Sequence, residues 1–289
     1  MQVPSDSPHG SGCPGGTPVA ARHAFHLKSA FAIAAAAWTT PPRPAMEVVL
    51  FETCDWRPWL ADAHALLSAA EAERVQRRRQ AADRDALALA YALHRLVLGK
   101  ALDRDPSDVS LHRDERGCPR LAGDMAYTSL SHADGLIAIA VTVAGPIGVD
   151  IEPPGRATVM PEIARSVCHR SEAADLDALD EPARAAALLA LWVRKEALLK
   201  AAGVGLAVPM ETFAAPEDGA LVLPGLFADA VQVRMLDAGD RCVAAVAGPA
   251  GMRIECCWLP PRVGRGSQES SIRSAAWKIP GTGVSLDAS

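Results

Sequence analysis

The sequence predicts an α+β fold, because it contains both segments with the spacing of helices and short apolar segments typical of strands. Leu87, Tyr91 and Leu98 recur at helical spacing in one such segment. Strands are predicted at residues 47–51, 127–131, 136–143, 147–152, 231–236, 242–247 and 253–258. We expect the last three of these to form a closing antiparallel sheet. A chain of 289 residues is long enough for one large domain or two small ones.

Two helices in the first half of the chain are predicted from their ends. Ser68 and Glu71 have the spacing of a capping box, so a helix should start at Ser68. A second helix should run from Asp83 to Gly99, with the glycine as its C-cap, and it should be buried because it is apolar almost all round. We interpret the lone His94 of this helix as a core or rim residue rather than a ligand.

Both ends of the chain are expected to lie outside the folded part, which should start at Met46. Residues 1–45 are rich in Pro, Gly and Ser, and residues 263–289 combine Gly, Ser and Arg with little apolar periodicity, so we expect disorder in both. The apolar run at residues 30–38 comes late and precedes no small-residue cleavage site, which argues against a secretory signal. No apolar run approaches the ~20 residues of a membrane-spanning helix.

Charge and cysteine content narrow the class of protein. The formal net charge of −5 argues against a general surface for nucleic acid or anionic membrane. The seven cysteines are odd in number and lack C-x-x-C spacing, which indicates neither a disulfide framework nor a structural zinc. We therefore expect a cytoplasmic protein that binds neither nucleic acid nor membrane.

Three acidic side chains and one lysine form the most informative pattern. Asp150 and Glu152 alternate with apolar residues in a predicted strand, so both should point to one face. Glu196 and Lys200 are one turn apart on a helix predicted over residues 181–202. Mg²⁺ prefers oxygen ligands and leaves positions for water and substrate phosphate. The pattern therefore predicts a Mg²⁺ site in which Lys200 meets the phosphate.

Each of these residues also has a structural interpretation. Glu196 and Lys200 could form a surface ion pair, worth only ~0.2 to 0.5 kcal/mol. Trp192, on the same helix face, is interpreted as a packing residue without a role in the chemistry. His132 follows Ser131 at a predicted turn, and a protonated histidine can donate two hydrogen bonds to a phosphate. We favour the phosphate role for His132.

Ordered motifs give the chain a resemblance to a known family. They are Ser131-His132, Gly148 to Glu152, Trp192 to Lys200, and Gly203 to Leu206. In this order they are similar to the Ser-His, G-[VI]-D-[IV]-E, W-x-x-K-E-[AS]-x-x-K and G-x-G-L motifs of the Sfp-type 4'-phosphopantetheinyl transferases. Every fixed position of the nine-residue motif is filled. The resemblance covers roughly residues 46–260.

The resemblance implies an enzyme that needs Mg²⁺ and moves the 4'-phosphopantetheine group of coenzyme A onto a serine of an apo acyl or peptidyl carrier protein. The residues that match the family's metal ligands are Asp150, Glu152 and Glu196. The residues that match its phosphate-binding positions are Ser131, His132 and Lys200. Glu196 is also the candidate to accept the proton of the carrier serine. We expect Glu196, Lys200 and His132 to be the catalytic residues.

The family fold consists of two similar α/β halves that form a pseudo-dimer within one chain, here residues 46–150 and 151–262. We expect the protein to be a monomer. Two alternatives remain open at this point. One is another Mg²⁺-dependent phosphoester enzyme, such as a phosphohydrolase, which would share the carboxylates. The other is a non-catalytic protein that binds coenzyme A or a carrier protein.

Binding of the 3'-phosphate of coenzyme A is where the chain departs from the family. Arg74 falls on a basic position of the family, although an arginine run such as residues 74–84 is also typical of a solvated helix face or of a docking site for an acidic carrier. The positions that lack the family's basic residue are Glu71, Ala86 and Cys118. Arg116 and Arg120, which flank Cys118, would then supply the charge for coenzyme A.

Overall fold

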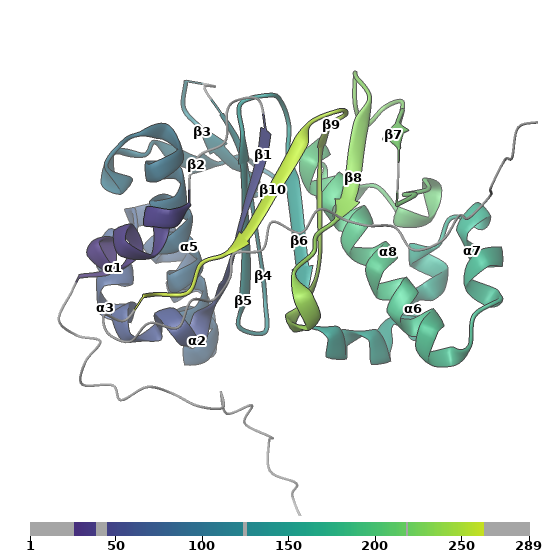
Figure 1. Cartoon of the computed structure of the whole chain (residues 1–289), viewed down its shortest axis with the longest axis horizontal. Helices are drawn as coiled ribbons and strands as arrows, with labels where there is room; N and C mark the ends of the chain where they lie inside the picture. The colour runs from purple at the N-terminus through teal and green to yellow at the C-terminus, as the bar shows by residue number, and fades with distance from the viewer. Residues whose placement is uncertain (1–25, 39–44, 124–125, 218, 263–289) are drawn as a thin grey trace, which may run out of the picture.

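The computed structural model describes residues 26–38, 45–123, 126–217 and 219–262, and it has the predicted mixed α+β class. Two four-stranded sheets stand side by side in the middle of the molecule, and helices cover the outer side of each (Figure 1). Within the described ranges, no helix is both long enough and apolar enough to span a membrane.

The first sheet has the strand order β10-β1-β5-β4. Its strands are β1 (Ala45–Glu52), β4 (Tyr127–Ala133), β5 (Leu136–Thr142) and β10 (Arg253–Trp258). The helices of this half include α2 (Thr53–Trp56), α3 (Leu60–Leu66), α4 (Ala69–Gln76) and α5 (Ala81–Leu102). Phe51, Trp56, Leu93 and Ile137 lie in the core between sheet and helices. A two-stranded hairpin of β2 (Leu111–Arg113) and β3 (Pro119–Leu121) extends from this half.

The second sheet has the strand order β6-β9-β8-β7. Its strands are β6 (Gly148–Glu152), β7 (Ala220–Leu221), β8 (Val231–Met235) and β9 (Val243–Pro249). Its helices are α6 (Met160–Val167), α7 (Arg170–Asp177) and α8 (Glu181–Ala202). Leu188, Val193, Leu198 and Val233 lie in a second core beneath these helices. The 3-10 turns found in the described part of the chain are η2 (Ala35–Ala37), η3 (Arg57–Trp59), η4 (Pro106–Asp108), η5 (Pro154–Val159), η6 (Gly205–Ala207), η7 (Met210–Thr212) and η8 (Gly239–Arg241).

The two sheets share a third buried cluster, which contains Val48 and Leu50 of β1 together with Val149 and Ile151 of β6. Val149 and Ile151 are fully buried, as the alternation of the motif predicted. Gly148 explains why this motif begins with glycine. A Cβ at position 148 would collide with the backbone of α8 at the carbonyl oxygen of Ala197. The missing side chain lets β6 lie directly against α8, which brings the two parts of the predicted acidic site together.

The chain crosses between the sheets at points that differ from the expected division at residue 150. Strand β6 belongs wholly to the second sheet, where it pairs with β9. The expectation that residues 253–258 close an antiparallel sheet of the second half was wrong, because β10 returns to the first sheet and runs parallel to β1. Met46 pairs with Ile254 in this register. The last described strand therefore ties the second half to the first.

Three predicted element ends need correction. Helix α5 ends beyond Gly99, and Asp103 takes the left-handed backbone at φ 53° that was assigned to the glycine. Gly99 is instead required by close packing, because a Cβ there would lie 2.9 Å from the carbonyl oxygen of Arg104. Helix α4 begins with the predicted capping box but ends at Gln76, so the arginine run at residues 74–84 does not form one continuous helix face. His132 lies on strand β4 and not in the turn that follows it.

The expected disorder of residues 1–45 was wrong for the part of this segment that the structure describes. Residues 27–34 form helix α1 (Leu27–Ala34), and its Leu27 and Phe31 side chains are buried in the core beside Trp56. The backbone N–H of Leu27 donates to Asp62, and Lys28 pairs with Asp105 at 2.9 Å. The apolar run that the sequence analysis noted therefore packs as part of the first half. Residues 1–25, 39–44 and 263–289 lie outside the described ranges.

His94 is a core residue, as predicted, and this gives an expected pH dependence of stability. Its Nε2 lies 2.7 Å from Thr128 Oγ1, which donates to Ala140 O and therefore accepts the histidine N–H. Burial, with smaller contributions from Arg113 and Arg95, lowers the pKa of His94 from 6.5 to about 3. In the unfolded state His94 is protonated below about pH 6.5, whereas in the folded state it stays neutral down to about pH 3. The free energy of unfolding therefore falls as the pH falls from about 6.5 to about 3.

We expect the free energy of unfolding to drop by about 2 kcal/mol between pH 7 and pH 5 on account of this histidine alone. Urea denaturation at the two pH values measures this drop. In His94→Gln, which can still donate to Thr128 but does not titrate, the difference between the two pH values should shrink by the same amount. An equal pH dependence in wild type and variant would contradict the assignment.

Candidate active site

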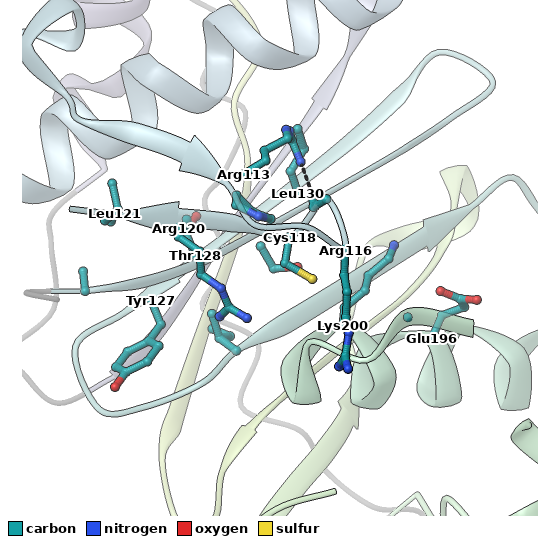
Figure 2. A pocket seen from close by; sticks show the side chains of 16 residues that line it. Arg113, Arg116, Cys118, Arg120, Leu121, Tyr127, Thr128, Leu130, Glu196 and Lys200 are labelled. Atoms are coloured by element: carbon teal, nitrogen blue, oxygen red, sulfur yellow. Dashed lines mark hydrogen bonds between the residues drawn. The ribbon is translucent and has the colours of Figure 1, made fainter. Parts of the chain in front are cut away.

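A cavity of about 500 Å³ lies between the β2–β3 hairpin, strand β4 and helix α8. Figure 2 shows Arg116, Cys118 and Arg120 on the hairpin side of this cavity and Glu196 and Lys200 on the α8 side. Tyr127 and Leu130 of β4 also line it. Four of the predicted site residues, Arg116, Arg120, Glu196 and Lys200, thus border one cavity, which lies at the junction of the two halves.

Asp150, Ser131 and Lys200 meet at the buried junction of β4, β6 and α8. Lys200 Nζ lies 2.6 Å from Asp150 Oδ1 and 2.9 Å from Ser131 Oγ, and the serine hydroxyl donates to the same Asp150 oxygen at 2.8 Å. Asp150 is only 4% exposed. The main partner of Lys200 is therefore Asp150 of the G-V-D-I-E motif. Lys200 does not form the surface ion pair with Glu196 that was the structural alternative.

Glu152 and Glu196 lie close enough to this group for the charges of Asp150 and Lys200 to act on both. Burial, then the charge of Asp150, raises the pKa of Glu152 to about 7. Burial also raises the pKa of Glu196, which Asp150 raises further and Lys200 lowers. No described residue forms a hydrogen bond or an ion pair with the Glu196 carboxylate. This carboxylate is free to accept a proton or a ligand.

The acidic residues suit a hard divalent cation, although they are not arranged as a finished site. Among residues 26–38, 45–123, 126–217 and 219–262, no three His, Cys, Asp or Glu side chains are clustered tightly enough to form a metal site. Asp150 Oδ2, however, is a buried oxygen without a hydrogen-bond partner in these ranges. Such an oxygen is costly unless a cation or donor meets it. The oxygen donors of Asp150, Glu152 and Glu196 therefore fit Mg²⁺ chemically.

His132 lies apart from the other phosphate-binding candidates. Side chains alternate along β4, so His132 points to the opposite face from Ser131. It lines a second cavity, of about 820 Å³, together with Arg78 and Asp83. Desolvation by the surrounding protein, then the positive charges of Arg78 and Lys200, lowers the pKa of His132. A bound anion would reverse the effect of these cations, which is what a phosphate-binding histidine requires.

The hairpin cations are held by contacts near the end of α8. Arg116 Nη1 lies 3.3 Å from the carbonyl oxygen of Gly203, and Arg120 forms an ion pair with Asp114 at 3.0 Å. Burial, with the charge of Asp114, raises the pKa of the Cys118 thiol, so this position supplies no charge where the resemblance implies a lysine. The charge at this side of the cavity therefore comes from arginines.

Arg113 is a cavity residue that the sequence analysis missed. Its guanidinium stacks on the ring of Tyr91, 4.8 Å from the ring centre, and donates to Gly117 O at 2.8 Å, the bond that is dashed in Figure 2. Its charge also acts on His132 in the neighbouring cavity. The only sequence signal was its place near Arg116 and Arg120, which carries no functional information by itself.

Arg74 and Glu71 have different roles on α4. Arg74 is exposed, and its Nη2 would lie 3.5 Å from a Cβ at Gly117, so it reaches the turn of the β2–β3 hairpin. Glu71 is buried and forms an ion pair with Arg95 at 2.7 Å. It also accepts the N–H of Ser68 in the capping box. Glu71 is therefore a structural residue, which explains why no basic side chain stands there.

Lys195, the first lysine of the nine-residue motif, is also structural. Its ammonium is fully buried and donates to the carbonyl oxygens of Val167, Met210 and Phe213 at 2.7, 2.9 and 2.7 Å. It also forms an ion pair with Glu172 at 2.6 Å. These contacts fix the face of α8 that lies opposite the cavity, and they orient the helix that carries Glu196 and Lys200.

Comparison with known proteins agrees with this geometry. Residues 146–234 match the 4'-phosphopantetheinyl transferase superfamily. The chain is 31% identical over 151 residues to a 4'-phosphopantetheinyl transferase of Bacillus subtilis, covering 52% of this chain and 66% of that one. It is 32% identical over 127 residues to 4'-phosphopantetheinyl transferase Sfp of Bacillus subtilis (strain 168), covering 43% and 55%. It is 29% identical over 194 residues to 4'-phosphopantetheinyl transferase HetI of Nostoc sp., covering 65% and 81%.

The matched part spans less than two thirds of the length of the first two relatives. It nevertheless includes the G-V-D-I-E strand and the helix of the nine-residue motif, which meet at Asp150 and Lys200. Fold and site together define a two-sheet α+β protein with acidic residues at the junction of the sheets, beside a cavity lined in part by arginines. Over the matched part, the chain is similar to the 4'-phosphopantetheinyl transferases, which are enzymes.

Proposed function

We propose that the protein transfers the 4'-phosphopantetheine group of coenzyme A to a serine of an apo acyl or peptidyl carrier protein. The observation that carries this proposal is the contact of Lys200 with Asp150 and Ser131, beside Glu196 and at the wall of a cavity lined by arginines. The serine oxygen forms a bond to the phosphorus of the phosphopantetheine. The bond from this phosphorus to the bridging oxygen breaks, and adenosine 3',5'-diphosphate leaves.

Asp150, Glu152 and Glu196 would hold Mg²⁺ in this reaction. When bound, the ion neutralises charge on the pyrophosphate. Two observations favour a cation at this place. Oδ2 of Asp150 is buried without a partner, and burial, then repulsion by Asp150, raises the pKa of Glu152. Proton loss from Glu152 must accompany metal binding, because only the ionised carboxylate is a strong ligand.

Three sets of cations would contact coenzyme A. Lys200 lies beside the acids and is placed to stabilise charge on the transferred phosphate. His132 and Arg78 lie across β4 and offer a second place for a negatively charged group. Arg116 and Arg120 would contact coenzyme A from the hairpin. Since the two cavities lie on either side of β4, the ligand would extend across the end of this strand.

Glu196 is the residue we assign as general base. Its carboxylate is free of hydrogen bonds from the described residues, and its raised pKa makes it a stronger base than an exposed glutamate. The proton of the carrier serine would pass to this carboxylate as the serine attacks. No covalent intermediate with the protein is needed.

We also propose that the two halves are structurally related, as the resemblance implies. Each half has a four-stranded sheet covered by a long helix, and α5 and α8 both contain 22 residues. A monomer in the cytoplasm is the simplest form for such a pseudo-dimer. Among the described residues, free thiols that suit a reducing compartment are those of Cys118, Cys168, Cys242, Cys256 and Cys257.

Incubation of the protein with coenzyme A, Mg²⁺ and an apo carrier protein tests the proposed function. We expect the carrier to gain the mass of one phosphopantetheine arm, and a carrier whose acceptor serine is replaced by alanine to gain nothing. Cleavage of coenzyme A without carrier modification would indicate a phosphohydrolase. Binding of coenzyme A or carrier without any mass change would indicate a non-catalytic binding protein.

Arg74 is expected to contribute to recognition of the 3'-phosphate. A single charge-assisted hydrogen bond contributes about 1.5 to 3 kcal/mol, so coenzyme A should bind about tenfold to a hundredfold better than 3'-dephospho-coenzyme A. Calorimetric titration of Arg74→Ala should show a smaller ratio between the two ligands. Arg79→Ala removes another exposed arginine of the same segment and serves as the control. Equal affinity of the wild type for both ligands would remove this role from α4.

A further inference from the structure

Arg156 is a cation at the acidic site that neither the motifs nor the proposed reaction accounts for. It lies on η5, one turn after the end of β6, and its Nε is 3.3 Å from Glu152 Oε1. Its guanidinium lies over the ring of Trp192, 5.7 Å from the ring centre. Trp192 thereby acquires a role besides packing, because its ring is a surface on which the guanidinium of Arg156 rests.

The charges of the acidic site are therefore opposed by cations of the chain itself. Lys200 pairs with Asp150, and Arg156 pairs with Glu152. The charge of Arg156 also acts on Glu196. A divalent cation that binds these carboxylates must compete with the guanidinium for the negative charge of Glu152, whose Oε1 already contacts Arg156.

The two cations differ in how firmly they are held. Lys200 makes two short hydrogen bonds to buried partners, and its side chain is 28% exposed. Arg156 makes one longer contact with Glu152, and its side chain is 41% exposed. A partly exposed guanidinium can turn away from Glu152 along the face of Trp192 and remain hydrated. Arg156 is thus the cation that can leave when a metal arrives.

We propose that Arg156, supported by Trp192, is an internal counter-ion that competes with the divalent cation for Glu152 and so sets the metal affinity of the site. This inference rests on the metal site of the proposed function. Arg156 is a positioning residue and takes no part in the chemistry. In the metal-free protein it holds Glu152 in place and reduces the repulsion between Glu152 and Asp150.

Direct metal binding tests this role without any measurement of transfer. Mn²⁺ is added to the full chain at pH 8, and free Mn²⁺ is measured by electron paramagnetic resonance. We expect Arg156→Gln to bind Mn²⁺ about three- to tenfold more tightly than wild type, a modest gain because the lost charge is partly screened by solvent. Arg156→Lys keeps the charge and should stay close to wild type.

Arg184→Gln is the matched control. Arg184 has the same 41% exposure and pairs with Asp177, but it lies more than three turns before Glu196 on α8, about 18 Å away along the helix. Its removal should leave Mn²⁺ affinity unchanged. Trp192→Leu should tighten binding by a smaller factor than Arg156→Gln, because the guanidinium loses its support but keeps its charge.

The outcomes separate this inference from the proposed metal site. If the wild type binds Mn²⁺ and Arg156→Gln binds it equally well or more weakly, the counter-ion role is overturned, but the metal site stands. An equal gain in Arg184→Gln would also overturn it, since the effect would then be one of net charge. Absence of Mn²⁺ binding in both wild type and Arg156→Gln would remove the metal site and the inference together. Binding by the variant alone would support Arg156 as the competing cation.

Discussion

Glu196→Gln is expected to lower kcat for phosphopantetheine transfer by at least about a hundredfold, the range typical of a lost general base. The amide keeps the size of the side chain and one oxygen that can face a metal, but it can neither carry the charge nor accept the serine proton. Single-turnover measurement of carrier modification at saturating coenzyme A, Mg²⁺ and carrier reads this step directly. Affinity for coenzyme A in the presence of Mg²⁺ should weaken much less.

Trp192→Phe is the control for a disturbance of α8 that spares the acids. Its ring packs with the second core and supports Arg156, so this substitution should change the melting temperature more than the rate. If Glu196→Gln retains near-normal transfer at saturating Mg²⁺, another group accepts the proton. The assignment of Glu196 as base would then be wrong, although the similarity to the family would stand.

Local periodicity predicted those parts of the site that lie within a single element. Asp150 and Glu152 alternate with two fully buried residues, and this pattern needs only the two-residue repeat of a strand. The end of α8 at Gly203 was likewise predicted by its glycine, which adopts a left-handed backbone at φ 68°. In each case the local structure is determined by residues that are close together in the sequence.

Contacts between distant elements could not be predicted in the same way. The partner of Lys200 is Asp150, which the helix pattern cannot reveal because the contact depends on how closely β6 approaches α8. The pairing of β1 with β10 links strands more than 200 residues apart, and strand composition says nothing about which partner a strand will choose. Gly99 misled the prediction of a helix end because glycine serves close packing as well as left-handed backbone.

The arginines of the site were the hardest residues to predict. Arg113 and Arg156 stand in a hairpin and a 3-10 turn, where no periodicity distinguishes a functional arginine from a solvated one. The position of each guanidinium is set by an aromatic ring and a hydrogen-bond acceptor. For Arg113 these are the ring of Tyr91 and the carbonyl oxygen of Gly117. The motifs locate the acids, and only the packed structure locates the cations that oppose them.

Asp150→Ala is expected to reduce transfer by about a thousandfold or more, because a metal site contributes several kcal/mol of transition-state stabilisation. The fold should survive. Removal of this buried carboxylate relieves its repulsion with Glu152, and Lys200, which loses its partner, is exposed enough to be hydrated. We therefore expect the melting temperature of the metal-free variant to stay within a few degrees of wild type.

Glu71→Ala provides the matched comparison, because Glu71 is a buried acid at 6% exposure against 4% for Asp150 but serves the fold. Its loss leaves the buried guanidinium of Arg95 without its carboxylate partner. The free energy of unfolding should therefore fall by about 3 to 5 kcal/mol. Thermal melting and transfer per folded molecule, measured on both variants, separate the two roles. If Asp150→Ala loses its activity only together with a collapse of its melting temperature, as expected for Glu71→Ala, then Asp150 is a structural residue and the metal must be held elsewhere.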